Sequence, residues 1–256
     1  MSGPPAGSRG WLAVWNGAQR LYVDDRHRAL HFRHVAEQVV ALVPARPAHV
    51  LDYGPGDALH AGDVADAVGR VTLCEASDLI RGQLRERFAG HPRVTVLAGP
   101  DPGAVADGSV DLLVVNSVVQ YLDRSDLEAL LAEARRLLAP GGRLVVGDVV
   151  PPADAPVAAL GRDVGSMLRY AARHGFLGAA VRSLVATALS PYTLTRMRLG
   201  LTTYGEEELR GVLAAAGFTA RRHHPNLSHD RARLTVVAHR SAGDAAVPPP
   251  DRALPA

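Results

Sequence analysis

Short apolar runs alternate with stretches of helical periodicity over most of the chain. The runs are bounded by turn-forming residues, which is typical of strands buried in a sheet. Strands separated by helices are the signature of βαβ units, so we expect a mainly parallel sheet covered on both faces. The expected strands are residues 49–53, 71–75, 94–97, 110–116 and 143–150, and the expected helices between them are residues 61–68, 78–88 and 125–138.

The segment before the first strand has a helical pattern of its own. Apolar residues recur at helical spacing from Phe32 to Val43, which predicts an amphipathic helix over residues 26–43. Asp25 precedes this pattern as an N-cap, and Pro44 closes it. We therefore expect the fold to begin with an N-terminal helix.

The alternating pattern stops after residue 150. Residues 151–203 form a long segment with helical periodicity over 157–174 and 177–189. A connection of this length needs its own explanation, because it either thickens the core or closes over a ligand. We favour a helical lid, since the segment leaves the carboxyl end of a strand, where ligands bind in parallel sheets.

The last part of the pattern predicts a helix over residues 206–216 and strands over 218–223 and 233–240. The connection between these two strands is too short to hold a crossover helix. They should therefore be antiparallel neighbours, with the first of them parallel to the rest of the sheet.

Both ends of the chain are rich in Gly, Pro or Ser and offer little to bury. We expect residues 1–10 and 241–256 to be disordered, which leaves residues 11–240 as one domain. A chain of 256 residues buries enough surface to fold without a metal or a disulfide. The single cysteine, Cys74, fits a buried thiol in a reducing cytoplasm.

The charged residues exclude several classes of function. All 28 basic residues are arginine, which excludes mechanisms that need a lysine amine, such as a Schiff base or a phosphate-binding P-loop. The formal net charge is +2, and the arginines are interleaved with 26 acids. We therefore expect neither nucleic acid nor a membrane as a partner, and no apolar stretch is long enough to span a bilayer.

The most informative segment runs from Val50 to Ala58, where an apolar strand leads into a Gly-rich turn. Gly54 and Gly56 let the backbone turn sharply and approach a ligand closely. Glu75 ends the next strand 19 residues after Gly56, a position from which an acid accepts hydrogen bonds from ribose hydroxyls. This pair predicts a site for an adenosine-type cofactor, with a tight turn beside a surface acid as the alternative.

The turn and two later segments resemble the class I S-adenosylmethionine (SAM)-dependent methyltransferases. The first motif of that family reads acid-x-Gly-x-Gly-x-Gly and is matched over residues 52–58, with an alanine in place of the last glycine. Residues 109–122 resemble the family's fourth strand and the loop after it, and residues 137–144 resemble its Pro-Gly-Gly turn. Residues 116–122 and 147–149 are similar to the N-methyltransferase domains of nonribosomal peptide synthetases.

The resemblance implies a fold, a cofactor and a set of binding residues. The fold is α/β and Rossmann-like: a seven-stranded, mainly parallel sheet with an antiparallel last strand, an N-terminal helix and a helical lid insertion. The cofactor is SAM. Its binding residues would be Gly54 and Gly56 for the methionine part and ribose, Asp52 for support of that loop, Glu75 for the ribose, Asp101 for the adenine side, and Asn116 and Ser117 beside the sulfonium.

Residues that bind the methyl acceptor are expected in three places. Gln120 and Tyr121 follow the fourth strand, where a tyrosine face can stabilise a cation. His229 lies in the loop between the last two strands, and we expect it to act as general base while Tyr121 positions the acceptor. An ordinary turn histidine is the alternative. The lid would add lining side chains from Met167, Tyr170, His174, Phe176 and Tyr192.

His27, His31 and His34 share one face of the N-terminal helix. This spacing could bind a metal, but no Glu follows His27 as it does in zinc proteases. We therefore expect no metal here, and interpret these histidines as a solvated or lid-facing surface.

These observations together predict a cytoplasmic SAM-dependent methyltransferase that acts on a hydroxyl or amine of a small specialised metabolite. Two alternatives stay open. An NAD(P)-dependent oxidoreductase uses a similar sheet, but its fingerprint needs a third glycine where this chain has Leu59. A protein that binds SAM without transferring the methyl group would carry the same cofactor motif. The pattern specifies neither the acceptor nor the oligomeric state.

Overall fold

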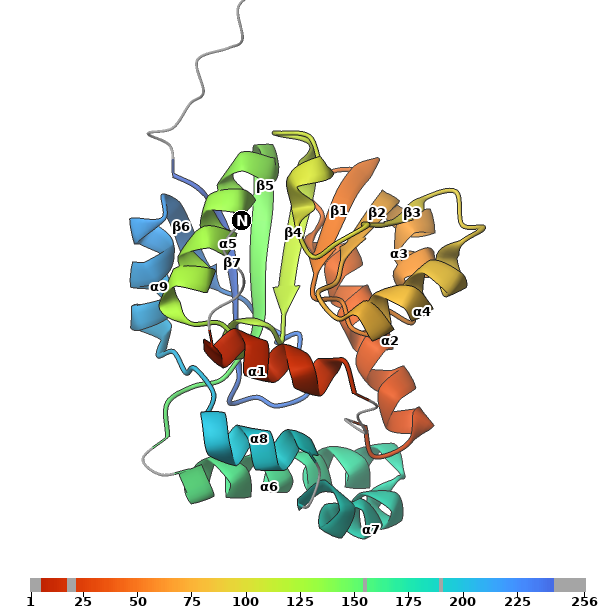
Figure 1. Ribbon diagram of the computed structural model, residues 1–256, viewed down its shortest axis with the longest axis vertical. Coiled ribbons are helices and arrows are strands. Elements are labelled where there is room, and N and C mark those ends of the chain that lie inside the picture. The colour runs from red at the N-terminus through yellow and green to blue at the C-terminus, as the bar shows by residue number, and fades with distance from the viewer. Residues whose placement is uncertain (1–5, 18–21, 154–155, 189–190, 242–256) are drawn as a thin grey trace, which may run out of the picture.

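The computed structural model describes residues 6–17, 22–153, 156–188 and 191–241. Seven strands of this part of the chain form one sheet in the order β3-β2-β1-β4-β5-β7-β6 (Figure 1). The strands are β1 (Ala48–Tyr53), β2 (Gly69–Cys74), β3 (Val94–Val96), β4 (Val110–Asn116), β5 (Leu138–Val149), β6 (Phe218–Arg222) and β7 (Leu234–Arg240).

The strand directions confirm the expected mixed sheet. β1 pairs in parallel with β2 and β4, and the parallel pairing extends outward to β3 and β5. β7 pairs antiparallel with both β5 and β6, so β6 runs in the direction of the first five strands. The loop between β6 and β7 therefore leaves at the carboxyl edge of the parallel strands.

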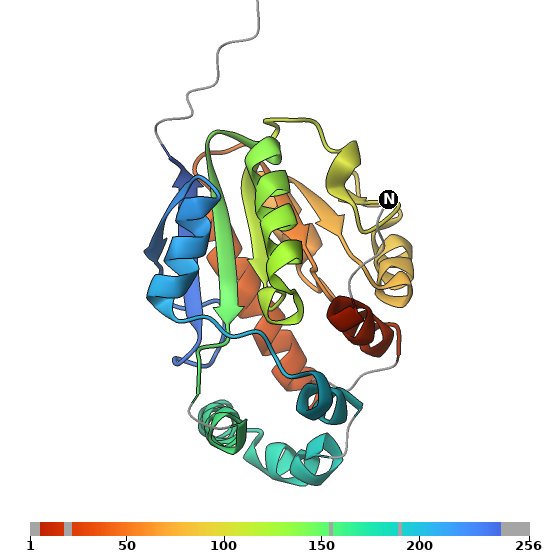
Figure 2. The same cartoon turned by 60° about the vertical axis from the view of Figure 1, so that its left-hand side comes forward.

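Helices cover both faces of the sheet and lie beyond its carboxyl edge (Figure 1). They are α1 (Ala6–Trp15), α2 (Asp25–Leu42), α3 (Ala61–Val68), α4 (Asp78–Phe88), α5 (Arg124–Leu137), α6 (Pro156–His174), α7 (Leu177–Ala188), α8 (Pro191–Leu199) and α9 (Glu206–Ala215), with the 3₁₀ helices η1 (Pro102–Ala104) and η2 (Val119–Tyr121). α5 and α9 pack on one face, and α2, α3 and α4 pack on the other (Figure 2).

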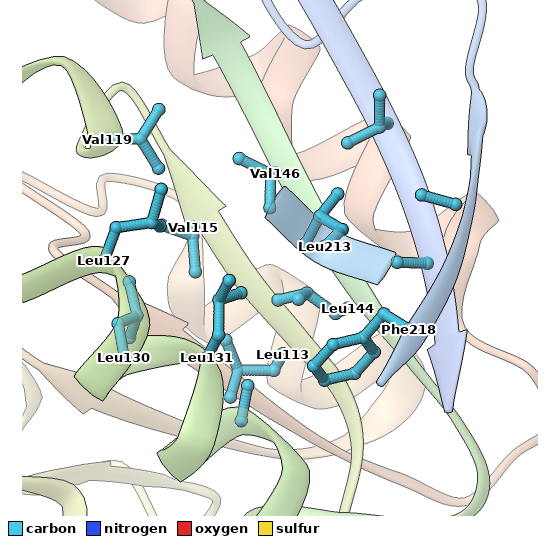
Figure 3. Packing of buried hydrophobic residues seen from close by; sticks show 14 of the residues in the cluster. Leu113, Val115, Val119, Leu127, Leu130, Leu131, Leu144, Val146, Leu213 and Phe218 are labelled. Carbon is cyan, nitrogen blue, oxygen red and sulfur yellow. The ribbon is translucent and has the colours of Figure 1, made fainter. Parts of the chain in front are cut away.

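The pleat of β4 divides the core into two clusters. Leu113 and Val115 face α5 and α9, where they meet Leu131 and Phe218 (Figure 3). The alternate residues of the strand, such as Val114, face the cluster of α2, α3 and α4. Because β4 is buried on both faces, its sequence is a continuous apolar run, as expected of a central parallel strand.

Helix α1 corrects one expectation. We expected disorder through residue 10, but α1 begins at Ala6. The ring of Trp11 is only 4% exposed, and this burial stabilises a helix that the Gly- and Pro-rich sequence does not favour by itself. The other residues for which we expected disorder, 1–5 and 242–256, lie outside the described part of the chain.

The start of α2 corrects another expectation. The helix begins at Asp25, and its N-cap is Asp24 rather than Asp25. The Asp24 side chain accepts a hydrogen bond from the backbone N of His27 at 2.8 Å. A side chain one residue earlier thus satisfies a free N–H group of the first turn.

The segment after β5 forms α6, α7 and α8, which lie beyond the carboxyl edge of the sheet (Figures 1 and 2). α6 packs against α7, and α8 packs against α1 and α7. A small buried cluster of Ala171, Phe176 and Ala180 joins α6 to α7, and Leu30 of α2 packs against it. These three helices are called the lid helices below, and their cluster is separate from the two sheet cores.

Candidate active site

Strand β1 leads into a turn that is built on two glycines. Gly54 has a φ of +69°, and a Cβ at this position would lie 2.6 Å from Cγ2 of Val118. Gly56 has a φ of +57°, and no atom lies within 4 Å of the place that its Cβ would take. Both conformations favour glycine. The backbone at Gly56 is therefore open to close approach by a ligand.

Glu75 follows β2 and is held against this turn. Its Oε2 accepts a hydrogen bond from Gly56 N at 3.2 Å, and its Oε1 accepts one from Ser77 N at 2.8 Å. Burial raises the pKa of the Glu75 carboxyl, while these N–H donors act in the opposite direction. Arg81, which was not among the expected site residues, is buried and donates to the backbone O of Glu75 at 2.7 Å.

Asp52 lies near the end of β1 and is half-buried. Burial, and then the charge of Glu75, raise the pKa of the Asp52 carboxyl to about 7. The group is thus divided between its protonated and ionised forms near neutral pH. A carboxyl with such a pKa at the end of a central strand is typical of a functional site.

The ends of β4 and β5 carry polar groups and backbone strain. Asn116 Oδ1 is buried and has no hydrogen-bond partner among the described residues. Ser117 has a φ of +59° and Asp148 a φ of +53°. Ser117 Oγ donates a hydrogen bond to Asp148 Oδ2 at 2.7 Å. Positive φ values in two adjoining non-glycine residues are the kind of strain that collects at functional sites.

These features fit a cofactor that combines a ribose with positive charge. The open backbone at Gly56 leaves room for it, and the Glu75 carboxylate beside the turn can accept bonds from hydroxyls. The ionisable carboxyl of Asp52 and the unpaired oxygen of Asn116 are acceptors for cationic or N–H groups. The structure brings together Asp52, Gly54, Gly56, Glu75, Asn116 and Ser117 at the carboxyl edge of β1, β2 and β4.

Asp101 has a local structural role in the described structure. Its Oδ1 accepts a hydrogen bond from Gly103 N at 2.8 Å and so caps the 3₁₀ helix η1. The side chain is exposed. Its assignment to the adenine side of the cofactor stays a prediction.

Helix α1 crosses the carboxyl edge of the sheet (Figure 1). Four aromatic side chains meet there. The ring centroid of Trp11 lies 4.7 Å from that of Tyr121 in η2, and that of Trp15 lies 5.3 Å from it. Tyr192 of α8 completes this α1 aromatic cluster, with its hydroxyl 3.3 Å from that of Tyr121. Burial raises the pKa of Tyr121 well above its usual value, so the phenol stays neutral.

The end of α1 is also bonded to the loop that holds Glu75. Asn16 Oδ1 lies 2.9 Å from both Ser77 Oγ and Asp78 N, which donate to it. Ser77 Oγ is also 3.0 Å from the carbonyl oxygen of Trp15. One helix thus contacts the turn beside Glu75 and, through its tryptophans, the expected acceptor side.

His229 lies in the loop between β6 and β7 and contacts two helices. Its ring centroid is 4.8 Å from that of Tyr170 in α6 and 5.7 Å from that of His27 in α2. Tyr170 also contacts His174 at 4.2 Å. Burial lowers the pKa of His229, while the Asp148 carboxylate acts to raise it. The imidazole is therefore neutral at pH 7, and His229, Tyr170 and His174 form one group, apart from the α1 aromatic cluster.

Sequence reasoning missed an ionic network between the sheet and the lid helices. Arg233, just before β7, has its Nη2 3.2 Å from Asp163 Oδ1 of α6 and its Nε 3.8 Å from Asp148 Oδ1. Arg196 of α8 lies 2.8 Å from the other oxygen of Asp163. One signal was present in the sequence, because Asp148 is an acid at the carboxyl end of an apolar strand. Asp163 and Arg196 gave none, since only the tertiary fold brings them together.

Two other expected substrate residues have different surroundings. Gln120 Oε1 is buried and has no partner in the part of the chain that the structure describes. Its backbone O accepts a hydrogen bond from Thr202 N at 2.9 Å. Met167 packs against the lid cluster of Ala171, Phe176 and Ala180. Gln120 therefore offers a free acceptor, whereas the contacts of Met167 serve the packing of the lid.

The histidine face of α2 packs against protein. His34 Nε2 lies 2.7 Å from the carbonyl oxygen of Asn226, and the His27 ring stacks on Phe176 at 5.5 Å. Within the described ranges, no group of three or more His, Cys, Asp or Glu residues is arranged to hold a metal ion. No helix of those ranges is both long and apolar enough to cross a membrane.

Comparison with known proteins identifies one family model and several curated relatives that are similar to part of this chain. Residues 51–146 match the family model that is described as a methyltransferase domain. A probable non-canonical nonribosomal peptide synthetase of Salinispora arenicola is 36% identical over 105 residues, which are 39% of this chain and 1% of that protein. The malonyl-[acyl-carrier protein] O-methyltransferase of Hahella chejuensis is 33% identical over 117 residues, 44% of this chain and 41% of that protein. The chain spans less than half the length of the curated relatives it matches.

A solved structure shares the fold over nearly the whole chain. It is the 1,6-didemethyltoxoflavin-N1-methyltransferase of Burkholderia thailandensis with bound 1,6-didemethyltoxoflavin and S-adenosylhomocysteine. The match has a TM-score of 0.58 at 19% identity and covers 94% of this chain and 92% of that chain. At this identity the similarity shows a common fold.

Proposed function

The chain contains a class I SAM-dependent methyltransferase domain, for which SAM is the cofactor, and from this premise we propose that it methylates a hydroxyl or amine of a small specialised metabolite. The observation that carries the proposal is the Gly54–Gly56 turn, which is open at Gly56 and held by the buried Glu75. We place the protein in the cytoplasm and assign it a small-molecule acceptor, with neither nucleic acid nor a membrane as substrate.

The site geometry supports a set of binding roles. Gly54 and Gly56 would hold the methionine part and ribose, and Glu75 would accept bonds from the ribose hydroxyls. Asp52 would support the turn, and Asn116 and Ser117, at the end of β4, would lie beside the sulfonium. When bound, SAM supplies an electrophilic methyl group on a cationic sulfur.

The protein's main catalytic contribution would be positioning. An in-line displacement needs the acceptor atom held about 3 Å from the reacting carbon, and correct placement alone can lower the barrier by about 7–11 kcal/mol. Tyr121 is suited to orient the acceptor, because its neutral hydroxyl is fixed by Tyr192 and its ring by Trp11 and Trp15. Its π-face also favours a nearby cation.

We assign the general base to His229. Burial keeps this imidazole neutral at pH 7 and thus able to accept a proton. The nearby Asp148 carboxylate stabilises the imidazolium that forms, because it acts to raise the pKa of His229. An amine acceptor that arrives neutral would not need this base, so the assignment applies to a hydroxyl acceptor.

Names of the relatives support an acceptor from specialised or carrier-bound metabolism. One relative is named as a peptide synthetase, and another as an O-methyltransferase for malonyl-[acyl-carrier protein]. A carrier-bound acceptor is therefore the second form in which the substrate could be presented to this chain.

The proposal is tested by calorimetry with SAM, followed by assays for S-adenosylhomocysteine release with hydroxyl and amine acceptors. Binding and turnover are the expected results. Binding of SAM without turnover on any acceptor would favour the alternative, a protein that binds SAM without methyl transfer. Absence of SAM binding would contradict the cofactor assignment.

His229 is tested separately by the variant His229→Ala. Loss of a general base should lower kcat by about 10²–10⁴-fold while the affinity for SAM is unchanged. His224→Ala is the matched control, because His224 is an exposed histidine of the same loop, and it should retain normal turnover. Near-normal turnover of His229→Ala from pH 6 to 9 would reject this role.

A further inference from the structure

The exposed apolar side chains of this protein are concentrated on the lid helices. Six large hydrophobic residues of the described chain are exposed, and five of them lie in α7 and α8. Met197 is 77% exposed, more than any other of the six. Scattered apolar residues on a surface need no explanation, but their concentration on two neighbouring helices is typical of an interaction site. The five residues are Leu177, Val181, Leu194, Met197 and Leu199.

The same helices have a larger positive charge than the chain as a whole. Residues 156–199 contain six arginines and one acid, Asp163, whereas the whole chain has a net charge of only +2. Asp163 is occupied by Arg196 and Arg233. The other five arginines are exposed, and none forms an ion pair with a described residue: Arg162, Arg169, Arg173, Arg182 and Arg198.

The apolar and basic residues share helix faces. Leu194, Met197 and Arg198 are three and four residues apart on α8, so they lie on one face. Leu177 and Val181 are four residues apart on α7 and share a face in the same way. α7 packs against both α6 and α8, so the three helices form one layer. This layer lies beyond the carboxyl edge of the sheet, on the side of the acceptor residues (Figures 1 and 2).

We infer that the exposed surface of α7 and α8, with the adjoining arginines of α6, is a docking surface for an acidic carrier-type protein that presents the acceptor on a phosphopantetheine arm. The inference rests on the proposed function and names the form of its substrate. Exposed arginines without accompanying acids select a partner of opposite charge. The apolar residues between them provide the contact area that such a complex buries.

An acidic protein fits this surface better than a lipid surface does. Met and Arg are enriched in protein–protein interfaces, and both are prominent here. Interfacial membrane helices instead insert Trp, Phe or Leu along a continuous apolar face. The described residues of the lid expose no aromatic side chain, since Tyr170 and Tyr192 are half-buried and Phe176 is buried.

The experiment measures binding of the full chain to the holo acyl-carrier protein of a type II fatty-acid synthase, a small and strongly acidic probe, at low and physiological ionic strength. We expect binding that weakens with salt. The triple variant Arg173→Glu/Arg182→Glu/Arg198→Glu should raise Kd by at least about tenfold. Met197→Glu should also weaken binding, because it places a like charge in the apolar part of the surface.

The matched control is Arg33→Glu/Arg70→Glu/Arg221→Glu, which makes the same change of charge at exposed arginines outside the lid. It should bind the carrier protein almost as wild type does. The inference is overturned if wild type does not bind the probe at low ionic strength, if both triple variants lose binding equally, or if Met197→Glu dissociates a self-associated form of the chain. Binding only to phosphatidylglycerol vesicles would overturn it in favour of a membrane.

Calorimetry with SAM separates failure of this inference from failure of the proposed function. The lid variants should bind SAM as wild type does, since their substituted side chains are not in the cofactor site. If the wild-type chain binds SAM but not the carrier protein, only the docking surface is contradicted. If it binds the carrier protein but not SAM, the proposed function is contradicted.

Discussion

At the scale of single residues, the candidate site depends on a few groups whose surroundings differ from those of ordinary side chains. Gly54 and Gly56 have positive φ values, Asp52 has a raised pKa, and Ser117 and Asp148 are strained. Each lies at or just beyond the carboxyl end of a central strand. The effect of a substitution at these positions on ligand affinity should therefore differ from its effect on the free energy of unfolding.

The first prediction concerns the turn and its acid. Gly56→Val should abolish SAM binding, because the side chain would fill the open space at this position. Glu75→Ala should weaken binding by about 1.5–3 kcal/mol, the contribution of hydrogen bonds to a charged acceptor. Calorimetry with SAM measures both effects.

Gly108 provides the control for the strain that valine introduces. Its φ is +60°, and no atom lies within 4 Å of its Cβ position, so it matches Gly56 in both respects. Gly108→Val should lower the melting temperature about as much as Gly56→Val but leave SAM affinity unchanged. Equal affinities in the two variants would contradict the role of Gly56.

The second prediction is a pH dependence of SAM affinity. The free Asp52 carboxyl has a pKa of about 7, and a cationic ligand favours its ionised form. Binding therefore releases a proton below pH 7, so affinity should rise with pH up to about 7 and stay constant above it. Calorimetry at several pH values should show this profile in wild type, and a flat one in Asp52→Asn. A flat profile in wild type would contradict it.

The same pKa has the opposite consequence for the protein without ligand. Because the folded pKa of Asp52 is raised, the folded state holds a proton that the unfolded state has already released. The contribution of Asp52 to the free energy of unfolding therefore decreases as pH rises from about 4 to about 7. Asp52→Asn should be more stable than wild type at pH 8 by urea denaturation, and the difference should shrink toward pH 4.

At the scale of elements, periodicity identified the strands and most helices because their core faces are regular. Residues 61–68, 78–88 and 110–116 have the bounds that the pattern predicts. The pattern failed at α1 and α8, whose stabilising contacts come from distant parts of the chain. Trp11 and Trp15 meet Tyr192 only in the tertiary fold. For the same reason the cofactor side of the site was readable as a local motif, whereas the network around Asp163 was not.

The third prediction tests the link between α1 and the cofactor side. Asn16→Ala removes the acceptor for Ser77 Oγ and Asp78 N, so the affinity for SAM should fall by about 3- to 10-fold. The chain has only two tryptophans, and both lie in α1. Their fluorescence should therefore shift to longer wavelength in the variant, as α1 becomes more solvated.

Ala13→Ser is the control for this experiment, since Ala13 is an exposed residue of the same helix. It should change neither the affinity for SAM nor the emission. If Asn16→Ala shifts the emission but binds SAM normally, α1 covers the site without supporting it.

At the scale of the whole molecule, the protein consists of a well-packed sheet domain and a helical layer with a much smaller core. Two large clusters fill the faces of the sheet, whereas among the side chains that the structure describes three buried residues join α6 to α7. Regions with few buried apolar contacts open at a lower free-energy cost than the rest of a protein. This difference supports the lid interpretation of α6, α7 and α8.

The fourth prediction follows from that difference. Amides of α6, α7 and α8 should exchange hydrogen quickly in the protein without ligands and become protected when cofactor and acceptor bind. Amides of β4 and β5 serve as the internal reference and should be protected in both states. Lid amides that are as slow as those of β4 without any ligand would show that these helices are part of the core.

The place of β7 in the sheet has a consequence for synthesis of the chain. β7 is the last of the described strands in the sequence but lies between β5 and β6. While the ribosome is still making residues before Leu234, β5 has an open edge and β6 has no neighbour to pair with. Unpaired edges are prone to aggregation. A chain truncated before Leu234 would therefore leave β6 unpaired as well as lacking β7. A fusion partner is better placed after residue 241 than within residues 218–240, which hold both strands.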